Sequence, residues 1–301
     1  MTGNTGNTGN TGNTGNTGNA GISGEFGGGW LIQDRADLPF VTRLDPTNIN
    51  ELGRLRRGAP ADGFGDRHWT AKWYAWSILH ELAPTGWAAA AEPSLTAIKN
   101  ALVANFGVEL DNLVLAARDE RPDAMGPILS QDVEFISDYL ALSAMTPGSH
   151  PKTYRVLHIA SQIGSFGALY FKALYDVTRP SQLCPALLPP VPVPGHSSFP
   201  SGHSTQAHLM QLCMKEVLGH PNSNLPAADQ DILNANLAIL ADSVARNREI
   251  AGLHYPSDSA GGKDLANSLL TALLNCPPLF PSTTAANRFN DAIAKAAREW
   301  S

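Results

Sequence analysis

Residues 151–180 read PKTYRVLHIASQIGSFGALYFKALYDVTRP and carry a long helical pattern. No proline interrupts the pattern between Pro151 and Thr178. We expect the helix to stop there, because the residue before Pro180 is disfavoured in the α conformation. The stretch therefore predicts one long helix.

The flanking sequence is also helical in pattern. A proline-dense connection follows over 185–200, and Gly107 breaks an upstream segment. Convincing β alternation is absent, so the sequence predicts an all-α helical bundle formed by a single domain over 30–301. The further helices that we expect are 90–106, 108–118, 130–145, 204–218, 227–250 and 256–274.

Three tryptophans mark a further helix near the start of this domain. Trp69, Trp73 and Trp76 follow the i, i+4, i+7 spacing of one helix face. We interpret this stripe as core packing, because large aromatic side chains are mostly buried.

The first residues have a different composition. Residues 2–19 repeat Thr-Gly-Asn six times, and we expect 1–29 to form a disordered low-complexity tail. No charged n-region with a following apolar h-region is visible. This favours a cytoplasmic protein, or a periplasmic or secreted one if a leader was removed or replaced.

The bulk composition excludes several classes of protein. The 301 residues carry a net charge of -6, which argues against a nucleic-acid-binding surface. No apolar run approaches the ~18 residues of a membrane span. Cys184, Cys213 and Cys276 lack metal-binding spacing, so we expect buried thiols, with one disulfide left open.

Lys172 and Arg179 lie near the end of the long helical pattern. Seven residues make two helical turns to within about 20°, so both side chains are expected on one helix face. Such a pair can clamp an oxyanion, with arginine as a bidentate fork and lysine as a point charge. Taken alone, such a pair is usually part of a solvated helix face, but the apolar residues around it weaken that interpretation, because cations beside core positions need a partner.

The tetrapeptide Pro200-Ser201-Gly202-His203 precedes another helical segment. Ser201 is a good N-cap, and Gly202 lets the backbone approach a ligand. Free N–H groups at a helix start form a natural phosphate site, which would place His203 beside the anion. We interpret His196 and His208 as ordinary histidines.

The third segment contains Arg248, His254 and Asp258. Arg248 is expected in the last turns of one helix, His254 in the connection, and Asp258 in the first turn of the next helix. A carboxylate that accepts from Nδ1–H of His254 would leave Nε2 free as a nucleophile or ligand.

The order and spacing of these segments resemble the superfamily of type 2 phosphatidic acid phosphatases and vanadium-dependent haloperoxidases. Its signature is Lys-x6-Arg-Pro, then Pro-Ser-Gly-His, then Ser-Arg-x5-His-x3-Asp. The chain matches all three parts between Lys172 and Asp258, except that Asn247 stands where the family usually has serine. The resemblance implies an all-α bundle.

The resemblance also implies roles for these residues. In the phosphatases of the family, the match to His254 attacks phosphorus, oriented by the match to Asp258, and the match to His203 protonates the leaving alcohol and later activates water. The phosphoryl oxygens would be held by Lys172, Arg179, Ser201, Gly202 and Arg248.

Two activities follow from this resemblance. The first is a metal-independent phosphatase that hydrolyses phosphate monoesters through a phosphohistidine and needs no cofactor. The second is a haloperoxidase, with vanadate as cofactor, His254 as ligand to vanadium, and peroxide and halide as substrates. A third reading is a non-catalytic helical protein that binds an anion, and a homo-oligomer is compatible with each.

Overall fold

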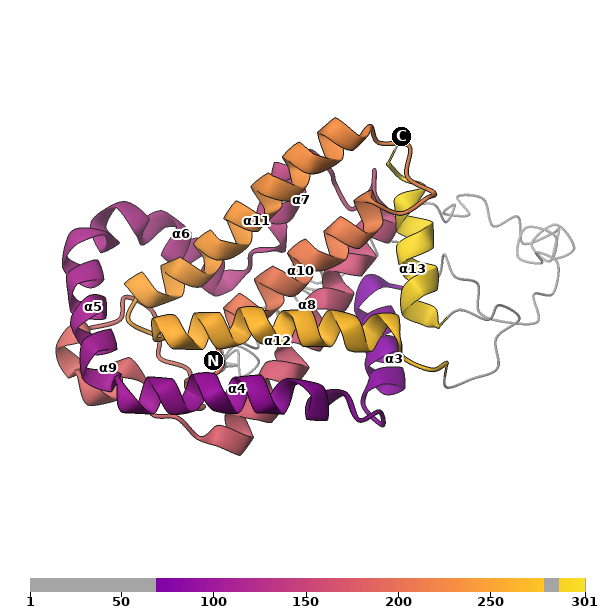
Figure 1. Ribbon diagram of the computed structural model, residues 1–301. Coiled ribbons are helices and arrows are strands. Elements are labelled where there is room, and N and C mark those ends of the chain that lie inside the picture. Colours follow the sequence, from indigo (N-terminus) through magenta and orange to yellow (C-terminus); the bar gives the residue numbers. More distant parts are fainter. Residues whose placement is uncertain (1–68, 279–286, 301) are drawn as a thin grey trace, which may run out of the picture.

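The computed structural model describes residues 69–278 and 287–300, and these residues form an all-helical bundle without a strand (Figure 1). The all-α prediction is confirmed at this level. The tail expected over 1–29 and the domain start expected at residue 30 lie outside the described residues. The helices are α3 (Ala71–Leu82), α4 (Trp87–Ala104), α5 (Phe106–Asp119), α6 (Arg121–Val133), α7 (Ile136–Leu142), α8 (Pro151–Tyr175), α9 (Pro180–Leu183), η4 (Pro185–Leu187), α10 (Gly202–Leu218), α11 (Ala227–Ile250), α12 (Pro256–Leu274) and α13 (Arg288–Ala297).

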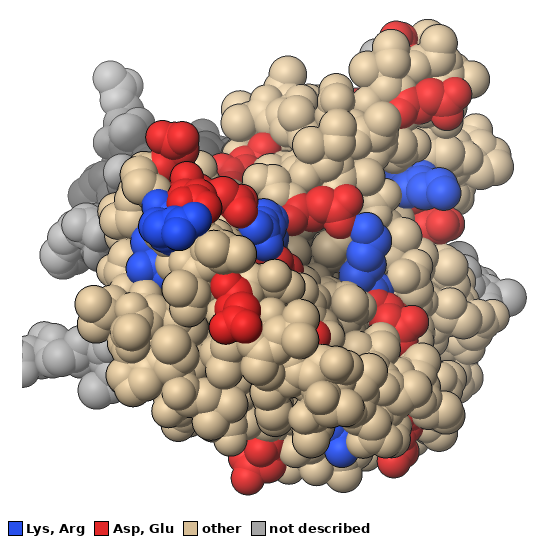
Figure 2. Space-filling view, turned by 60° about the vertical axis from the view of Figure 1, so that its left-hand side comes forward, with Lys and Arg blue, Asp and Glu red and all other residues tan. Residues whose placement is uncertain are grey.

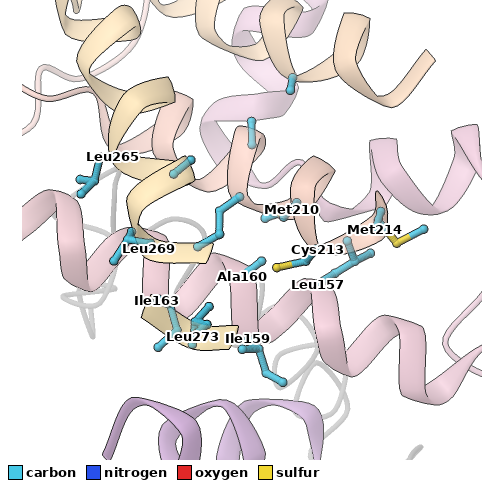
Figure 3. Close-up of a cluster of buried hydrophobic side chains, with 14 of the residues drawn as sticks. Leu157, Ile159, Ala160, Ile163, Met210, Cys213, Met214, Leu265, Leu269 and Leu273 are labelled. Atoms are coloured by element: carbon cyan, nitrogen blue, oxygen red, sulfur yellow. The ribbon is translucent and has the colours of Figure 1, made fainter. Parts of the chain in front are cut away.

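Helix α10 lies at the centre of the bundle and packs against α8, α11 and α12. Leucine, isoleucine and alanine side chains of α8 and α12 meet the apolar side chains of α10 in one buried cluster (Figure 3). α8 and α10 approach closely at Gly164, where a Cβ atom would lie 2.9 Å from the Cα atom of Gln206. The long helix predicted from residue 151 thus packs directly against the element whose N-terminus carries Ser201.

Several helix ends differ from the predictions. α8 ends at Tyr175, three residues earlier than expected, because Asp176 takes the left-handed conformation (φ 46°) that closes helices. The break expected at Gly107 lies at Asn105, and Gly107 is inside α5. The single helix expected over 130–145 is divided, because Glu134 is extended and ends α6.

The early end of α8 changes the position of Arg179. The prediction that Lys172 and Arg179 share one helix face is wrong, since Arg179 is the extended N-cap residue of α9. Pro180 occupies the first position of that short helix and keeps Arg179 out of the α conformation. Both cations nevertheless reach the same buried region, described below.

The tryptophan stripe does not pack into the core as predicted. Trp73 is 58% exposed and Trp76 is 47% exposed, whereas Trp69 lies half-buried just before α3. The opposite face of α3 supplies the buried side chains, among them Ile78 and Leu82. Spacing identifies residues that share a face, and here it did not identify which face is buried.

The structure also tests the predictions made for the cysteines and for membrane spans. Cys213 and Cys276 are buried and Cys184 is half-buried, and all three are free thiols. The buried-thiol prediction is thus confirmed for two of the three. Among the described helices, none combines the length and apolar character that crossing a bilayer requires.

Candidate active site

The N-terminus of α10 contributes backbone donors to the site. Ser201 is the N-cap, as predicted, and its hydroxyl accepts a hydrogen bond from the Ser204 N–H at 3.3 Å. The Ser201 N–H donates to the main-chain oxygen of Asp258 at 2.9 Å, which ties α10 to α12. Within the described residues, the N–H groups of Gly202 and His203 have no acceptor, so they and the positive end of the helix dipole can receive an anion.

His254 and Asp258 form the predicted pair at the start of α12. The His254 Nδ1–H donates to Asp258 Oδ2 at 2.9 Å, and the same oxygen accepts from the Tyr255 N–H at 3.0 Å and from the Ser198 hydroxyl. Nε2 of His254 makes no hydrogen bond within the described residues. The tautomer that the pair selects therefore carries a free lone pair on Nε2.

Burial shifts the pKa of both members of this pair. It raises the pKa of Asp258 to about 6, although the Ser198 hydroxyl and the charge of Lys172 act in the opposite direction. It lowers the pKa of His254 well below its ordinary 6.5, and the charges of Lys172 and Arg179 lower it further. His254 is therefore neutral at neutral pH, the state that a nucleophile requires.

Lys172 lies in the last turn of α8 and is only 2% exposed. Its ammonium donates to the carbonyl oxygens of Ser198 at 2.5 Å and Ser197 at 2.8 Å. The Ser197 hydroxyl returns a hydrogen bond of 2.6 Å to the Lys172 carbonyl. Burial and the nearby charge of Arg179 lower the pKa of Lys172 well below 10.5, with Asp258 offsetting part of the effect.

Arg179 is 1% exposed and is held mainly by carbonyl oxygens. Its Nε donates to His196 O at 2.8 Å and one terminal nitrogen donates to Leu253 O at 2.9 Å. The other terminal nitrogen donates to Nδ1 of His196 at 3.1 Å. Burial lowers the pKa of Arg179 to about 10, with the charge of Asp258 acting against it. These bonds place Arg179 directly beside the segment that carries His254.

Arg248 is fully buried in the last turn of α11 and meets the end of α6. Its terminal nitrogens contact Ile128 O at 2.6 Å and the Asp132 carboxylate at 3.4 Å. Its Nε is buried and has no partner among the described residues. Burial lowers the pKa of Arg248 to about 10, and Asp132 partly offsets this. An unpartnered N–H on a buried guanidinium is a position where an anion oxygen can bind.

His203 is 2% exposed, and the face of its ring stacks on Phe135, with centroids 5.5 Å apart. Its Nε2 lies 3.2 Å from the carbonyl oxygen of Gln131. Burial lowers the pKa of His203 well below 6.5, and the charge of Arg248 adds to the effect. A carbonyl oxygen only accepts, so Nε2 carries the proton and Nδ1 has the lone pair.

The charge balance of the site is positive. Lys172, Arg179 and Arg248 are all nearly inaccessible, and among the described residues the opposite charges that act on them come from Asp258 and the partly exposed Asp132. Figure 2 shows basic and acidic side chains interspersed on the face that includes α5 and α6, without a broad basic area. The positive charge of the site itself lies inside the bundle, where it interacts with a bound anion more strongly than it would in water.

The structure brings together every site residue predicted from the sequence and adds others. Ser198 joins Lys172 to Asp258, and Gln131 and Asp132 contact His203 and Arg248 from α6. His196, interpreted above as ordinary, contacts Arg179 directly. The α6 residues lie more than 70 positions from His203, and no local pattern in the sequence links them to the site.

His208 fits its interpretation as an ordinary histidine. Its Nδ1 donates to the Ser204 carbonyl at 2.8 Å and its Nε2 lies 3.0 Å from Asp242 on the surface.

No family model matches the chain, and no curated protein matches it either.

Proposed function

We propose that the chain is a phosphatase that hydrolyses phosphate monoesters through a covalent phosphohistidine. The observation that carries the proposal is the unbonded Nε2 of His254 beside the buried charges of Lys172 and Arg179, with buried Arg248 close to His203. These groups supply a seat for a phosphoryl dianion and a nucleophile beside it. The sequence resemblance described above supports the same reading.

Phosphoryl transfer depends mainly on positioning and on neutralisation of charge. The ammonium of Lys172, the Nε of Arg248 and the N–H of Gly202 can each bind a phosphoryl oxygen. Arg179 adds positive charge, although its five donors are largely committed to carbonyl oxygens and His196. No step of the proposal uses a metal ion, since these groups neutralise the charge that grows in the transition state.

In the first step, the lone pair of His254 Nε2 attacks phosphorus and the bond between phosphorus and the ester oxygen breaks. The departing oxygen takes a proton from His203, so a neutral alcohol leaves. Asp258 remains bonded to Nδ1–H and stabilises the positive charge that the His254 ring acquires. The product of this step is a phosphohistidine at His254.

In the second step, water attacks phosphorus as His203, now neutral, removes a proton from it. The bond between phosphorus and Nε2 breaks, its electron pair returns to His254, and inorganic phosphate leaves. Positive neighbours hold His203 neutral in the free protein, and a bound dianion would offset them. We therefore expect substrate binding to charge His203 and prepare it as the acid of the first step.

Vanadate, a tetrahedral oxyanion like phosphate, fits the same donors. Lys172, Arg179, Arg248 and Gly202 would hold its oxygens, and the free Nε2 of His254 can serve as a nitrogen ligand. Bound vanadate would supply activation of peroxide for halide oxidation, the second activity that the resemblance implies.

One experiment separates these activities. Purified, vanadate-free protein is assayed for hydrolysis of p-nitrophenyl phosphate, and vanadate is then titrated in. The phosphatase proposal predicts turnover that vanadate inhibits, and its loss in His254→Ala but not in the exposed-residue control His80→Ala. Absence of turnover in protein that binds vanadate would contradict the proposal, and bromide with hydrogen peroxide would then be tested.

A further inference from the structure

The last turn of α6 provides a fixed acceptor for His203. The Gln131 carbonyl belongs to the final helical turn, where carbonyl oxygens lack partners within the helix. It lies 3.2 Å from His203 Nε2. Because Glu134 is extended, the chain leaves the helix before an N–H could reach this oxygen, which stays available to the imidazole.

The side chain of Gln131 is itself held at both ends. Its Oε1 accepts from Asn247 Nδ2 at 2.9 Å, and its Nε2 donates to Asp138 Oδ2 at 3.1 Å. Gln131 is 4% exposed and Asn247 is 6% exposed, so water competes little for these bonds. The amide of Asn247 therefore fixes the α6 residue whose carbonyl contacts His203.

The position of Asn247 in the chain connects two parts of the site. It directly precedes Arg248, whose guanidinium contacts Ile128 O and Asp132 on the same turn of α6. Two neighbouring residues thus join the ends of α11 and α6. Arg248 binds Ile128 O and Asp132 through its terminal nitrogens, and Asn247 binds the side chain of Gln131, whose carbonyl contacts His203. Asn247 also stands where the resembled family usually has serine. The serine side chain lacks the amide and is too short to form this hydrogen bond with Gln131.

We infer that Asn247 and Gln131 are positioning residues for His203, an inference that rests on the proposed function. They hold the imidazole in the tautomer protonated at Nε2, which makes Nδ1 the atom that exchanges protons with the leaving alcohol and with water. The proton stays on Nε2, hydrogen-bonded to the Gln131 carbonyl oxygen throughout, and the Phe135 ring limits rotation of the imidazole. Loss of the Asn247 amide frees Gln131, and the tautomer and orientation of His203 are no longer unique.

The tautomer of His203 can be measured without any assay of activity. Nitrogen-15 NMR of the imidazole groups, assigned with His203→Gln, reports which ring nitrogen carries the proton in neutral histidine. We expect His203 to be protonated at Nε2 in the wild-type protein and to show a mixture of tautomers in Asn247→Ala. A wild-type proton on Nδ1, or identical spectra for the two proteins, would overturn the inference even if the protein is an active phosphatase.

Kinetics provide the second test. Asn247→Ala, Asn247→Ser and Gln131→Met are expected to lower kcat by about 10- to 100-fold with little change in KM, because misplacement of the acid–base group affects the reaction more than binding. If the two side chains act through one hydrogen bond, Asn247→Ala combined with Gln131→Met should cost no more than either change alone. Additive losses would overturn this coupling.

Asn222 offers a matched control for loss of an asparagine amide. Its Nδ2 donates to Ala294 O at 3.2 Å, at a position that contacts none of the site residues. Asn222→Ala should leave kcat and the His203 tautomer unchanged. A wild-type protein without turnover would count against the proposed phosphatase, whereas the NMR result would still decide the role of Asn247.

Discussion

The charges of Lys172 and Arg179 act on both His203 and His254, but the two imidazoles are held by different acceptors. A carboxylate accepts from Nδ1–H of His254, whereas a main-chain carbonyl lies against Nε2 of His203. A carboxylate stabilises a positively charged imidazole far more than a neutral carbonyl does. The arrangement fits a nucleophile that becomes cationic at His254 and a proton carrier at His203.

Replacement of the carboxylate tests this distinction directly. Asp258→Asn keeps the shape of the side chain but removes the charge, and its amide can present N–H to Nδ1 and select the wrong tautomer of His254. We expect kcat to fall by about 10³- to 10⁴-fold, as expected when the orienting carboxylate of a histidine is lost. Steady-state kinetics with p-nitrophenyl phosphate provide the measurement, and a loss below about tenfold would exclude the assigned role.

The pH dependence follows from the shifted pKa values at these residues. Because Asp258 has a pKa of about 6, protonation below that value weakens its hold on His254 and lowers the rate on the acid side. His203 must be protonated in the bound complex, so the rate also falls on the alkaline side once His203 loses its proton. We expect a bell-shaped profile of kcat between pH 5 and 8, and a flat profile across about this range would contradict the two-histidine mechanism.

At the scale of the helices, the sequence predicted the helix interiors, but it predicted the helix ends correctly in only some cases. The segments 227–250 and 256–274 match α11 and α12 at both ends, and Ser201 caps α10 as its residue type predicts. The end of α8 depends on a left-handed aspartate, a conformation that sequence signals for glycine do not capture. Contacts between elements distant in the sequence, such as that of α6 with His203, could not be predicted, because they depend on the tertiary packing.

The close approach of α12 to the N-terminus of α10 is a testable requirement of the site. A Cβ atom at Gly262 would lie 2.7 Å from both the Ser201 carbonyl oxygen and the Ser204 Cβ atom. Gly262→Ala should therefore separate the two helices, lower the free energy of unfolding by about 1–3 kcal/mol and reduce kcat. Chemical denaturation and kinetics measure both effects.

Gly126 supplies the matched control in an exposed stretch of α6. Among the described residues, no atom beyond the adjacent residues and the local helix backbone lies within 4 Å of a Cβ built at this position. Gly126→Ala is expected to leave activity unchanged, because the gain in helix propensity of about 1 kcal/mol and the opposing restriction before Pro127 are both local to α6. Equal effects of the two substitutions would show that the α10–α12 approach is not what the site depends on.

At the scale of the whole molecule, the site draws on α6, α8, α10, α11, α12 and the connection around residues 196–198. Lys172, Arg179, Ser201, Gly202, His203, Arg248, His254 and Asp258 were predictable because their residue types match a three-part signature in order and spacing. Gln131 and Asp132 were not, because nothing in their local sequence distinguishes a helix end that meets a buried guanidinium from one that meets solvent. Prediction of the core has the same limit. Trp73 is exposed although it is apolar, because residue type alone does not determine whether another element packs against a side chain.

Buried histidines should make the fold sensitive to acid. His158 on α8 is 6% exposed, its Nε2 has no partner among the described residues, and burial lowers its pKa to about 4. Between about pH 6.5 and 4 the unfolded chain binds a proton that the folded protein rejects, so stability falls as pH falls, by up to roughly 3 kcal/mol for this group. Urea denaturation of His158→Gln should show a shallower loss of stability over this range, whereas exposed His80→Gln should follow the wild type. Parallel curves for His158→Gln and the wild type would refute the assignment.

In the proposed mechanism, phosphate is transferred to His254 and then, with the help of His203, to water. The most direct measurement is a rapid alkaline quench of the protein during turnover of ³²P-labelled p-nitrophenyl phosphate, followed by peptide mapping. We predict an alkali-stable, acid-labile label on the peptide that contains His254, and more label in His203→Ala, because p-nitrophenolate leaves without a proton while attack by water still needs a base. Turnover without label on either protein, or label that persists in His254→Ala, would contradict the account.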